Sequence, residues 1–465
     1  MLAIGVDIGT TTLCGVITNS ETGEIEKAIT LNNHSTLEGR YSWEQLQDPD
    51  RILNRVKHII AALSEGRTQI GAIGITGQMH GIVYVNAVGE AVSPLFTWQD
   101  GRGDLPRANG KSYARYLSEK TGYSLATGYG TVTHFYNEEN GLVPQGAVRI
   151  CTIHAYAAMR LSGQREPVLH VSDGASLGLY DKERNAFDLE AARRAGLSPV
   201  LLPSVTKCTS PIGKTPEGVP VCPAIGDNQA SFIGSVKEPE AGVLVNVGTG
   251  SQISRYINAF AQLPGMDTRP LYSESYLLVG APLCGGSAYA LLEGFYRSVA
   301  ALASEKPGLL SDKHLYNAMD KAVLALLDKE STDGLGAWRE LKVSPLFSGT
   351  REAPQLRGSI TQIAMDNFTP EHLALGFLKG MAAQLYDYYE DMVKHTGAAP
   401  QYLVGSGNGI RKNLPLKRVL EKTFGLPLKI PRYKEEASYG ASLLALASTG
   451  GFKDMEEARA VIRYE

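Results

Sequence analysis

Two segments of the chain combine an apolar run with glycine and hydroxyl residues, the residue types that can surround an anion. The residues concerned are Gly9, Thr10, Thr11 and Thr12 in the first segment and Gly248, Thr249 and Gly250 in the second. Glycine lets backbone N–H groups approach an anion closely, and threonine hydroxyls add further donors. Either segment alone could be an ordinary hairpin turn. Their occurrence in opposite halves of the chain favours a duplicated domain with a phosphate held between the copies.

Asp7 lies at the end of the apolar run of the first segment, two residues before Gly9. Its carboxylate could cap the turn through the N–H groups of Gly9 or Thr10. A carboxylate beside a phosphate loop is also suited to hold hydrated Mg²⁺. We favour the metal role, with the contact made through water.

Asp227 follows the apolar run 221–225 and precedes a helical pattern. An aspartate at this position is a common helix cap. It is also well placed as a general base that takes a proton from a hydroxyl attacking phosphorus. Phosphoryl transfer depends mainly on positioning and charge stabilisation, so one aspartate can suffice. Because two phosphate loops accompany Asp227, we predict that it is the catalytic base.

A third glycine-rich segment, residues 405–413, joins an expected strand to an expected helix. It could be only a tight connection between them. It could also let an adenine ring lie against bare backbone, with Asn408 or Asn413 reaching the edge of the ring. The predicted nucleotide contacts here are Gly405, Ser406, Gly407, Asn408 and Asn413.

Two polar segments of the first half form the candidate substrate site. A polyol needs several converging hydrogen-bonding side chains and an apolar wall against its carbons. Gln78, His80, Asp100 and Arg102 supply the former, and Met79 and Trp98 supply the latter. Alternatively, His80 is a structural histidine, and Asp100 and Arg102 form a surface ion pair that contributes little energy.

The periodicity of the chain predicts the elements that position these residues. Each half begins with strands, continues with a helix and then adds strands, which is typical of an RNase H-like α/β core. The expected strands are 3–6, 13–18, 70–75, 243–247, 252–256 and 402–404, and the expected helices are 49–63, 370–397 and 414–424. Residues 331–337 are expected to form a surface loop. Since 465 residues exceed one ordinary core, we predict domains 1–226 and 227–465.

Composition excludes several classes of function. A net charge of −3 gives no basic surface for nucleic acid or an anionic membrane. The five cysteines lack metal-binding spacing and are expected to be buried thiols in a reducing compartment. No apolar run is long enough to cross a membrane, and we expect a cytoplasmic protein.

Taken together and in order, these motifs resemble the FGGY carbohydrate kinase family, within the superfamily of sugar kinases, heat-shock proteins and actin. They are the loop 7–12, QMHG at 78–81, WQDGR at 98–102, GDNQAS at 226–231, NVGTGS at 246–251 and GSGNGIRKN at 405–413. The resemblance implies two RNase H-like (actin-like ATPase) domains flanking a catalytic cleft. It also implies ATP-dependent phosphorylation of a primary hydroxyl with Asp227 as base, Mg²⁺ bridging the phosphates, and adenine near residues 405–413.

Residues 97–102, 126–130, 152–156, 173–180 and 280–286 further resemble the sedoheptulokinase branch of this family. Two segments depart from the usual family pattern. Residues 134–139 lack the lysine and tryptophan of the family's N-terminal signature, and Asn246 stands where the family more usually has serine. We therefore expect a ketose kinase that acts on sedoheptulose and binds the sugar and ATP. A homodimer is a possible assembly. The alternatives are another FGGY pentulose or polyol kinase such as a xylulokinase, an actin-like assembly protein, and a catalytically silent sugar sensor.

Overall fold

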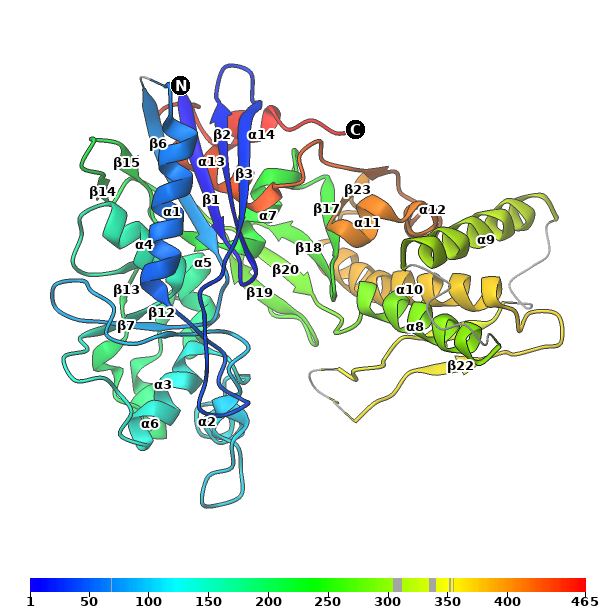
Figure 1. Cartoon of the computed structure of the whole chain (residues 1–465), viewed down its shortest axis with the longest axis horizontal. Helices are drawn as coiled ribbons and strands as arrows, with labels where there is room; N and C mark the ends of the chain where they lie inside the picture. Colours follow the sequence, from blue (N-terminus) through cyan, green and yellow to red (C-terminus); the bar gives the residue numbers. More distant parts are fainter. Residues whose placement is uncertain (68, 304–311, 334–339, 351–352, 354) are drawn as a thin grey trace.

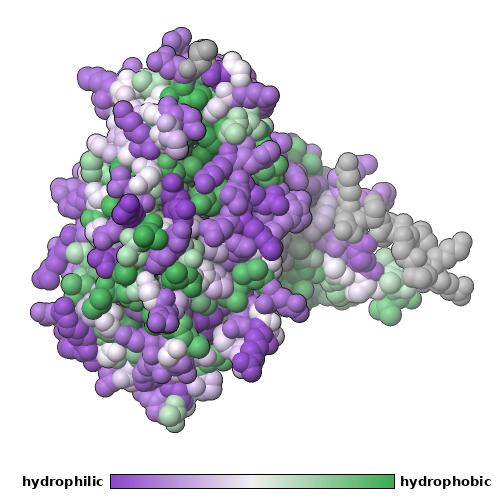
Figure 2. All heavy atoms as spheres, turned by 60° about the vertical axis from the view of Figure 1, so that its left-hand side comes forward, coloured by the Kyte–Doolittle hydropathy of each residue, from purple (hydrophilic) through white to green (hydrophobic). Residues whose placement is uncertain are grey.

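The computed structural model describes all residues except 68, 304–311, 334–339, 351–352 and 354. Two mixed sheets form the frame of the molecule, one from residues before 227 and one from residues after it (Figure 1). Hydrophilic and hydrophobic residues are interspersed over the face shown in Figure 2. No described helix is both long and apolar enough to cross a membrane.

The first sheet has the order β14-β15-β6-β1-β2-β3, and β16 also pairs with β6. Strands β1, β2 and β3 form an antiparallel meander, whereas β6, β15 and β16 run parallel to β1 on its other side. The bounds are β1 Leu2–Ile8, β2 Thr12–Asn19, β3 Ile25–Asn32, β6 Ile70–Gly77, β14 Gly213–Lys214, β15 Pro220–Val221 and β16 Ile225–Gly226.

The second sheet, of order β19-β20-β18-β17-β23-β24, repeats this plan. Strands β17, β18 and β20 are antiparallel, and β23 and β24 run parallel to β17. The bounds are β17 Gly242–Val247, β18 Ser251–Ile257, β19 Asp267–Pro270, β20 Tyr276–Gly280, β23 Tyr402–Ser406 and β24 Leu428–Lys429. The predicted fold class of two RNase H-like domains is therefore confirmed, and so are the predicted strands of both sheets.

Helices α7 (Asp227–Ser235) and α13 (Glu436–Ser448) lie between the two sheets. Their backbones cross closely, because a Cβ on Gly440 would lie 1.9 Å from the carbonyl oxygen of Ala230. Helix α13 also packs against β1 and β6, so the end of the chain covers the sheet formed by its beginning. The domain division at residues 226 and 227 stays a prediction.

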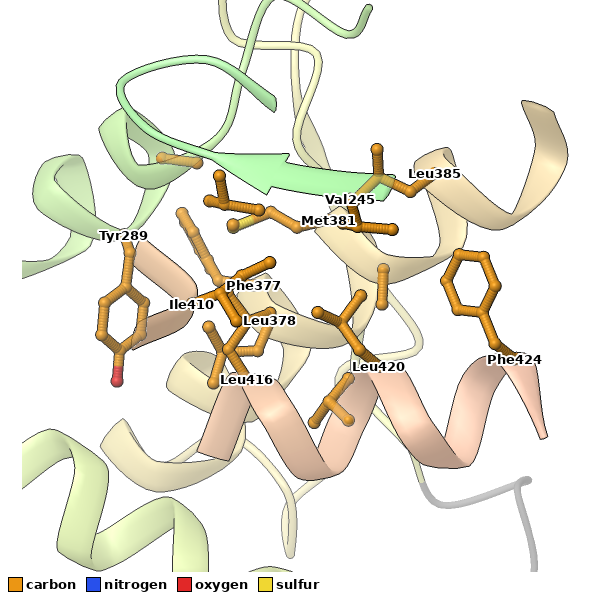
Figure 3. Packing of buried hydrophobic residues seen from close by; sticks show 14 of the residues in the cluster. Val245, Tyr289, Phe377, Leu378, Met381, Leu385, Ile410, Leu416, Leu420 and Phe424 are labelled. Atoms are coloured by element: carbon orange, nitrogen blue, oxygen red, sulfur yellow. The ribbon is translucent and has the colours of Figure 1, made fainter. Parts of the chain in front are cut away.

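The outer faces of the sheets carry the other main helices. In the first half, α1 (Pro49–Ser64) begins where the Asp48 side chain accepts from two backbone N–H groups, and it buries one apolar face on β1 and β2. In the second half, α10 (Pro370–Thr396) packs against α12 (Leu414–Phe424) and β18. Figure 3 shows this core, which includes Val245, Tyr289, Phe377, Leu378, Met381, Leu385, Ile410, Leu416, Leu420 and Phe424.

Shorter elements complete the described chain. The remaining strands are β4 Thr36–Leu37, β5 Leu46–Gln47, β7 Val83–Val85, β8 Leu95–Phe96, β9 Arg149–Cys151, β10 Val168–His170, β11 Tyr180–Asp181, β12 Ala186–Phe187, β13 Ser204–Thr206, β21 Lys342–Ser344 and β22 Ser359–Thr361. The remaining α-helices are α2 Tyr113–Thr121, α3 Gly130–Glu139, α4 Ile153–Leu161, α5 Val171–Gly174, α6 Leu189–Ala195, α8 Gly286–Ala303, α9 Asp312–Asp333, α11 Asn408–Lys412 and α14 Met455–Ala460. Single 3₁₀ turns are η1 Gly101–Asp104, η2 Ala175–Leu177 and η3 Pro199–Leu201.

Two local expectations need correction. Helix α9 continues to Asp333, so the first residues of the expected loop 331–337 are helical. Their polar character favoured a loop, but the helix extends through them. The rest of that loop lies outside the described residues. The five cysteines are free thiols, but Cys208 is exposed and Cys14 half-buried, so burial of all five was wrong.

Candidate active site

Asp7 and Asp227 reach the same edge of the first sheet. Asp7 pairs with Thr76 in the parallel register of β1 and β6, and Ile225 pairs with Thr76 from the other side. Asp227 then follows β16 directly. Because the carboxyl ends of parallel strands meet at one edge, the two strongest sequence candidates for metal binding and base catalysis are neighbours.

The local geometry of Asp227 does not fit a simple helix cap. Gly226 is the N-cap residue of α7, and Asp227 is its first helical residue. Its Oδ1 accepts from the adjacent N–H of Asn228 at 2.6 Å. A Cβ on Gly226 would lie 2.7 Å from the sulfur of Met79, so glycine at this position lets Met79 pack against the backbone next to Asp227.

Burial raises the pKa of both carboxyl groups. Burial, followed by the charge of Asp227, raises the pKa of Asp7 to about 7, although His154 opposes the rise. Burial also raises the pKa of Asp227, while His154 and Arg269 oppose it. His154 itself is fully buried, and its Nε2 lies 3.0 Å from an oxygen of Asp173. Two desolvated, adjacent carboxylates favour a proton or a cation between them.

His80 and Tyr129 form a stacked aromatic wall. Their ring centroids are 4.8 Å apart and their planes differ by 8°. His80 has a left-handed backbone with φ 74°, which costs a non-glycine residue energy and is held here by Ser176. The Ser176 carbonyl lies 2.7 Å from His80 Nδ1, so Nδ1 carries the hydrogen. In the neutral ring, Nε2 is then the acceptor.

Thr10 connects the first glycine loop to both candidate substrate segments. Its hydroxyl donates to Gln78 Oε1 at 3.2 Å and accepts from the indole N–H of Trp98 at 3.1 Å. Gln78 donates in turn to Gln47, which donates to the carbonyl of Thr10. Thr11 and Thr12 are exposed. The Gln78 side chain therefore supports the loop, and the Trp98 ring, 45% exposed, remains at the surface.

Asp100 and Arg102 form a buried ion pair with each other. Arg102 Nε lies 2.6 Å from Asp100 Oδ1, and both side chains are almost fully buried. The second oxygen of Asp100 accepts from the N–H of Gln45 and from Arg102. The guanidinium packs 4.1 Å from the centroid of Phe96 and donates to Asn137. The alternative of a surface ion pair is therefore wrong, because aromatic residues cover the guanidinium. Both oxygens of Asp100 already accept hydrogen bonds within the protein.

The second and third glycine segments lie side by side. Asn246 pairs with Ser406 in the parallel register of β17 and β23, and its amide donates to the Ser406 hydroxyl at 2.7 Å. A Cβ on Gly407 would lie 2.6 Å from the carbonyl oxygen of Val247. Gly248 and Thr249 are exposed, and Gly250 is half-buried. This juxtaposition brings the two predicted nucleotide segments to one edge of the second sheet.

Asn408 and Asn413 have different surroundings. Asn408 is the first residue of α11. Asn413 caps α12, since its side-chain oxygen accepts from the N–H of Leu416 at 2.7 Å, and its amide donates to Asp320 at 3.3 Å. The Asn413 carbonyl oxygen is therefore engaged within the protein.

A cavity of about 1090 Å³ lies between the two halves. We call it the central cavity. Its wall from the first half includes Met79, His80, Tyr129, Ser176 and Lys182, and its wall from the second half includes Asp267, Arg269, Tyr388 and residues 281–284. The hydroxyl of Ser251 donates to the carbonyl of Cys284, which ties the second wall to the second glycine loop. Neither Asp100 nor Arg102 lines it.

Sequence reasoning missed several of these residues. Tyr129 and Ser176 lie in segments that resemble the sedoheptulokinase branch, but they were not predicted as site residues. Arg269 and Lys182 belong to short hairpins without a recognisable motif. Only their positions in space, from elements far apart in the chain, bring them to the cavity.

Comparison with solved structures gives the class of fold. A xylulose kinase from Lactobacillus acidophilus superposes with a TM-score of 0.81 at 19% identity, covering 100% of this chain and 92% of that one. Plasmodium falciparum glycerol kinase with ADP gives a TM-score of 0.79 at 18% identity, covering 100% and 93%. The fold is thus that of the kinases with actin-like ATPase domains.

Family models and curated relatives specify the class further. The N-terminal domain of the FGGY family of carbohydrate kinases matches residues 2–234, and its C-terminal domain matches residues 259–449. This chain belongs to the FGGY family of carbohydrate kinases. It is 26% identical to sedoheptulokinase of Mus musculus, over 96% of this chain and 97% of that one, and 26% identical to glycerol kinase of Aquifex aeolicus, over 98% and 91%. The protein is therefore an ATP-using phosphotransferase with an alcohol group as acceptor.

Proposed function

We propose that this protein transfers the γ-phosphoryl group of ATP to a primary hydroxyl of a ketose, with sedoheptulose as the preferred acceptor. The observation that carries the proposal is the position of Asp227, which directly follows β16 at the sheet edge reached by Asp7. Its neighbour Gly226 packs against Met79, which lines the central cavity. The similarity to sedoheptulokinase supports the choice of sugar. The xylulose and glycerol kinases among the similar proteins provide the competing acceptors.

In this proposal Asp227 accepts the proton of the attacking hydroxyl. The hydroxyl oxygen forms a bond to the γ-phosphorus, the bond from phosphorus to the bridging oxygen breaks, and ADP leaves. One Asp227 oxygen is fixed by the N–H of Asn228, so the other faces the acceptor. The rate depends on this alignment and on charge stabilisation more than on the strength of the base.

The surroundings of Asp7 fit a magnesium ion. Burial and Asp227 raise its pKa and His154 only partly opposes them, so its ionised form is incompletely compensated by the protein. Among the described residues no group of three His, Cys, Asp or Glu side chains could hold a metal alone. Mg²⁺ characteristically takes one or two carboxylates together with waters and substrate phosphates. When bound, it neutralises phosphate charge, and Asp7 would hold it through water.

The two halves divide the substrates between them. We assign His80, Met79 and Tyr129 to the sugar, because they form the polar and apolar wall of the central cavity. Thr10 and the first loop face the phosphates, and Gly248, Thr249 and Gly250 cradle them from the second half. Gly405 to Asn408 receive the adenine. Asp100 and Arg102 act on the sugar only indirectly, by stabilising the segment that carries Trp98.

Replacement of Asp227 by Asn tests the base. Asn keeps the shape but cannot accept the proton, and general-base catalysis contributes roughly 10²- to 10⁴-fold. We expect ADP release to fall by at least that factor while the dissociation constant for the sugar, measured by calorimetry, changes little. Asp387→Asn, at another carboxylate that lines the cavity, is the matched control. Retained turnover in Asp227→Asn would contradict the assignment.

A panel of acceptors tests the sugar. Sedoheptulose, D-xylulose, L-ribulose and glycerol are compared at equal concentration with ATP and Mg²⁺, with ADP release as the readout. We expect the highest kcat/KM for sedoheptulose. A higher value for D-xylulose or glycerol would reassign the substrate, and binding without ADP release would indicate a silent sugar sensor.

A further inference from the structure

Phosphoryl transfer requires positive charge near the three oxygens of the moving group, and the glycine loops of this protein do not supply it. Neither residues 9–12 nor residues 248–251 include a lysine or an arginine. Arg411, close to the third glycine segment, is held by Glu436 and by the carbonyl groups of Pro431 and Tyr433. The charge must come from elsewhere in the protein or from the metal.

Lys182 and Arg269 are the basic side chains among the described residues that line the central cavity. They come from opposite halves and share one partner: Asp267 accepts from Lys182 and, at 2.9 Å, from Arg269 Nε. The structure thus fixes the Arg269 guanidinium through its Nε. In the part of the chain that the structure describes, no hydrogen-bond partner of its two Nη atoms is found.

The backbone around Arg269 is attached to the helix that begins at Asp227. The side-chain amide of Gln229 donates to the carbonyl of Pro270 at 3.1 Å. Arg269 also interacts electrostatically with Tyr129 and with Asp227. Its charge opposes the rise that burial causes in the pKa of Asp227. The guanidinium therefore lies near both the proposed base and the aromatic wall of the sugar site.

We propose that Arg269 is a catalytic residue whose Nη groups face the oxygens of the phosphoryl group as it moves from ATP to the sugar hydroxyl. The inference rests on the proposed function. While the bond from the sugar oxygen to phosphorus forms and the bond to ADP breaks, Arg269 keeps its proton and donates hydrogen bonds. A guanidinium held by one N–H can present its remaining donors to phosphate oxygens in a fixed geometry. Asp267 is the positioning residue that fixes this orientation.

The test compares Arg269→Gln and Arg269→Lys with the control Lys182→Gln, which removes the other cation of the same cavity. Loss of a transition-state arginine reduces turnover by roughly 10³-fold or more. For Arg269→Gln we expect this loss in kcat, with the KM for sedoheptulose changed less than about threefold, and partial recovery on addition of guanidinium chloride at low concentration. Lys182→Gln should lose less than about tenfold.

A binding experiment separates this role from sugar binding. Binding of a mixture of ADP, Mg²⁺, aluminium fluoride and sugar is measured by calorimetry, because the aluminium fluoride imitates the moving phosphoryl group. Arg269→Gln should bind this mixture roughly 100-fold more weakly but bind ADP alone as the wild type does. A raised sugar KM with retained kcat, or unchanged aluminium fluoride binding, overturns the inference; if Arg269→Gln does not fold, Arg269→Lys is judged by the same measurements. Wild-type protein inactive with every acceptor would instead overturn the proposed function, and this inference with it.

Discussion

The indole N–H of Trp98 donates to the hydroxyl of Thr10 at 3.1 Å. These residues belong to two motifs far apart in the chain, a glycine-threonine loop and a candidate substrate segment. The same hydroxyl donates to Gln78. One threonine side chain thus connects the loop that would hold phosphate to both candidate substrate segments.

Replacing Thr10 by Val removes this hydroxyl and keeps the shape of the side chain. A net protein hydrogen bond is worth about 0.5–1.5 kcal/mol, so we expect kcat/KM for the sugar to fall roughly 3- to 10-fold. Thr10→Ser, which keeps the hydroxyl, should stay near the wild-type value.

A double-mutant cycle with Trp98→Phe identifies the bond responsible. If Thr10 acts through Trp98, the effects of Thr10→Val and Trp98→Phe on kcat/KM overlap, and the double variant resembles the single ones. Fully additive effects would show that the two residues act independently.

Much of the fold follows from local sequence. Strands such as β1 and β17 are short β-branched runs bounded by glycine, and α12 begins at an Asn-Leu-Pro signal. These patterns depend on neighbours in the chain, so they could be predicted. The sequence analysis also assigned Asp7, Asp227 and Met79 to metal, base and substrate, and the structure brings these residues to one edge of the first sheet.

The fate of Asp100 and Arg102 could not be predicted in this way. The sequence analysis placed them in the sugar site and kept a surface ion pair as the alternative. The Arg102 guanidinium is covered by Phe96 and bonded to Asn137, and Asn137 comes from a helix that follows later in the chain. The left-handed backbone of His80 likewise depends on Ser176. Such long-range contacts leave no periodic signal.

The buried pair gives a prediction on stability. Removing one partner of a buried ion pair leaves an uncompensated charge and typically costs about 3–5 kcal/mol. We therefore expect Asp100→Ala to lower the free energy of unfolding by this amount in urea titrations. The double variant Asp100→Ala with Arg102→Met should be less destabilised than the single one. The opposite ranking would show that the guanidinium is stable without its partner.

Asp7 gives a prediction on pH. Its pKa in the folded protein, about 7, lies above its ordinary value of 3.8. The folded state therefore binds more protons than the unfolded state between these values, and this group lowers stability as pH rises from about 4 to about 7. Asp7→Asn removes the cost.

Without Mg²⁺, the melting temperature of Asp7→Asn should equal that of the wild type near pH 4 and exceed it above pH 7, as measured by calorimetry. Mg²⁺ with ADP should stabilise the wild type more than the variant. A difference in melting temperature that does not change with pH would contradict the raised pKa.

The contact between α7 and α13 gives the last prediction. Gly440 has no space for a side chain, because a Cβ there would lie 1.9 Å from the backbone oxygen of Ala230. Backbone cannot yield as a flexible side chain does, and overpacking typically costs about 1–3 kcal/mol.

Gly294, in α8, is the matched control, since no atom lies within 4 Å of its Cβ position. Alanine is favoured over glycine in a helix by roughly 1 kcal/mol, so Gly294→Ala should be neutral or stabilising, whereas Gly440→Ala should destabilise the protein despite the same gain in helix propensity. Equal effects of the two substitutions on the urea midpoint would show that the helices separate at little cost.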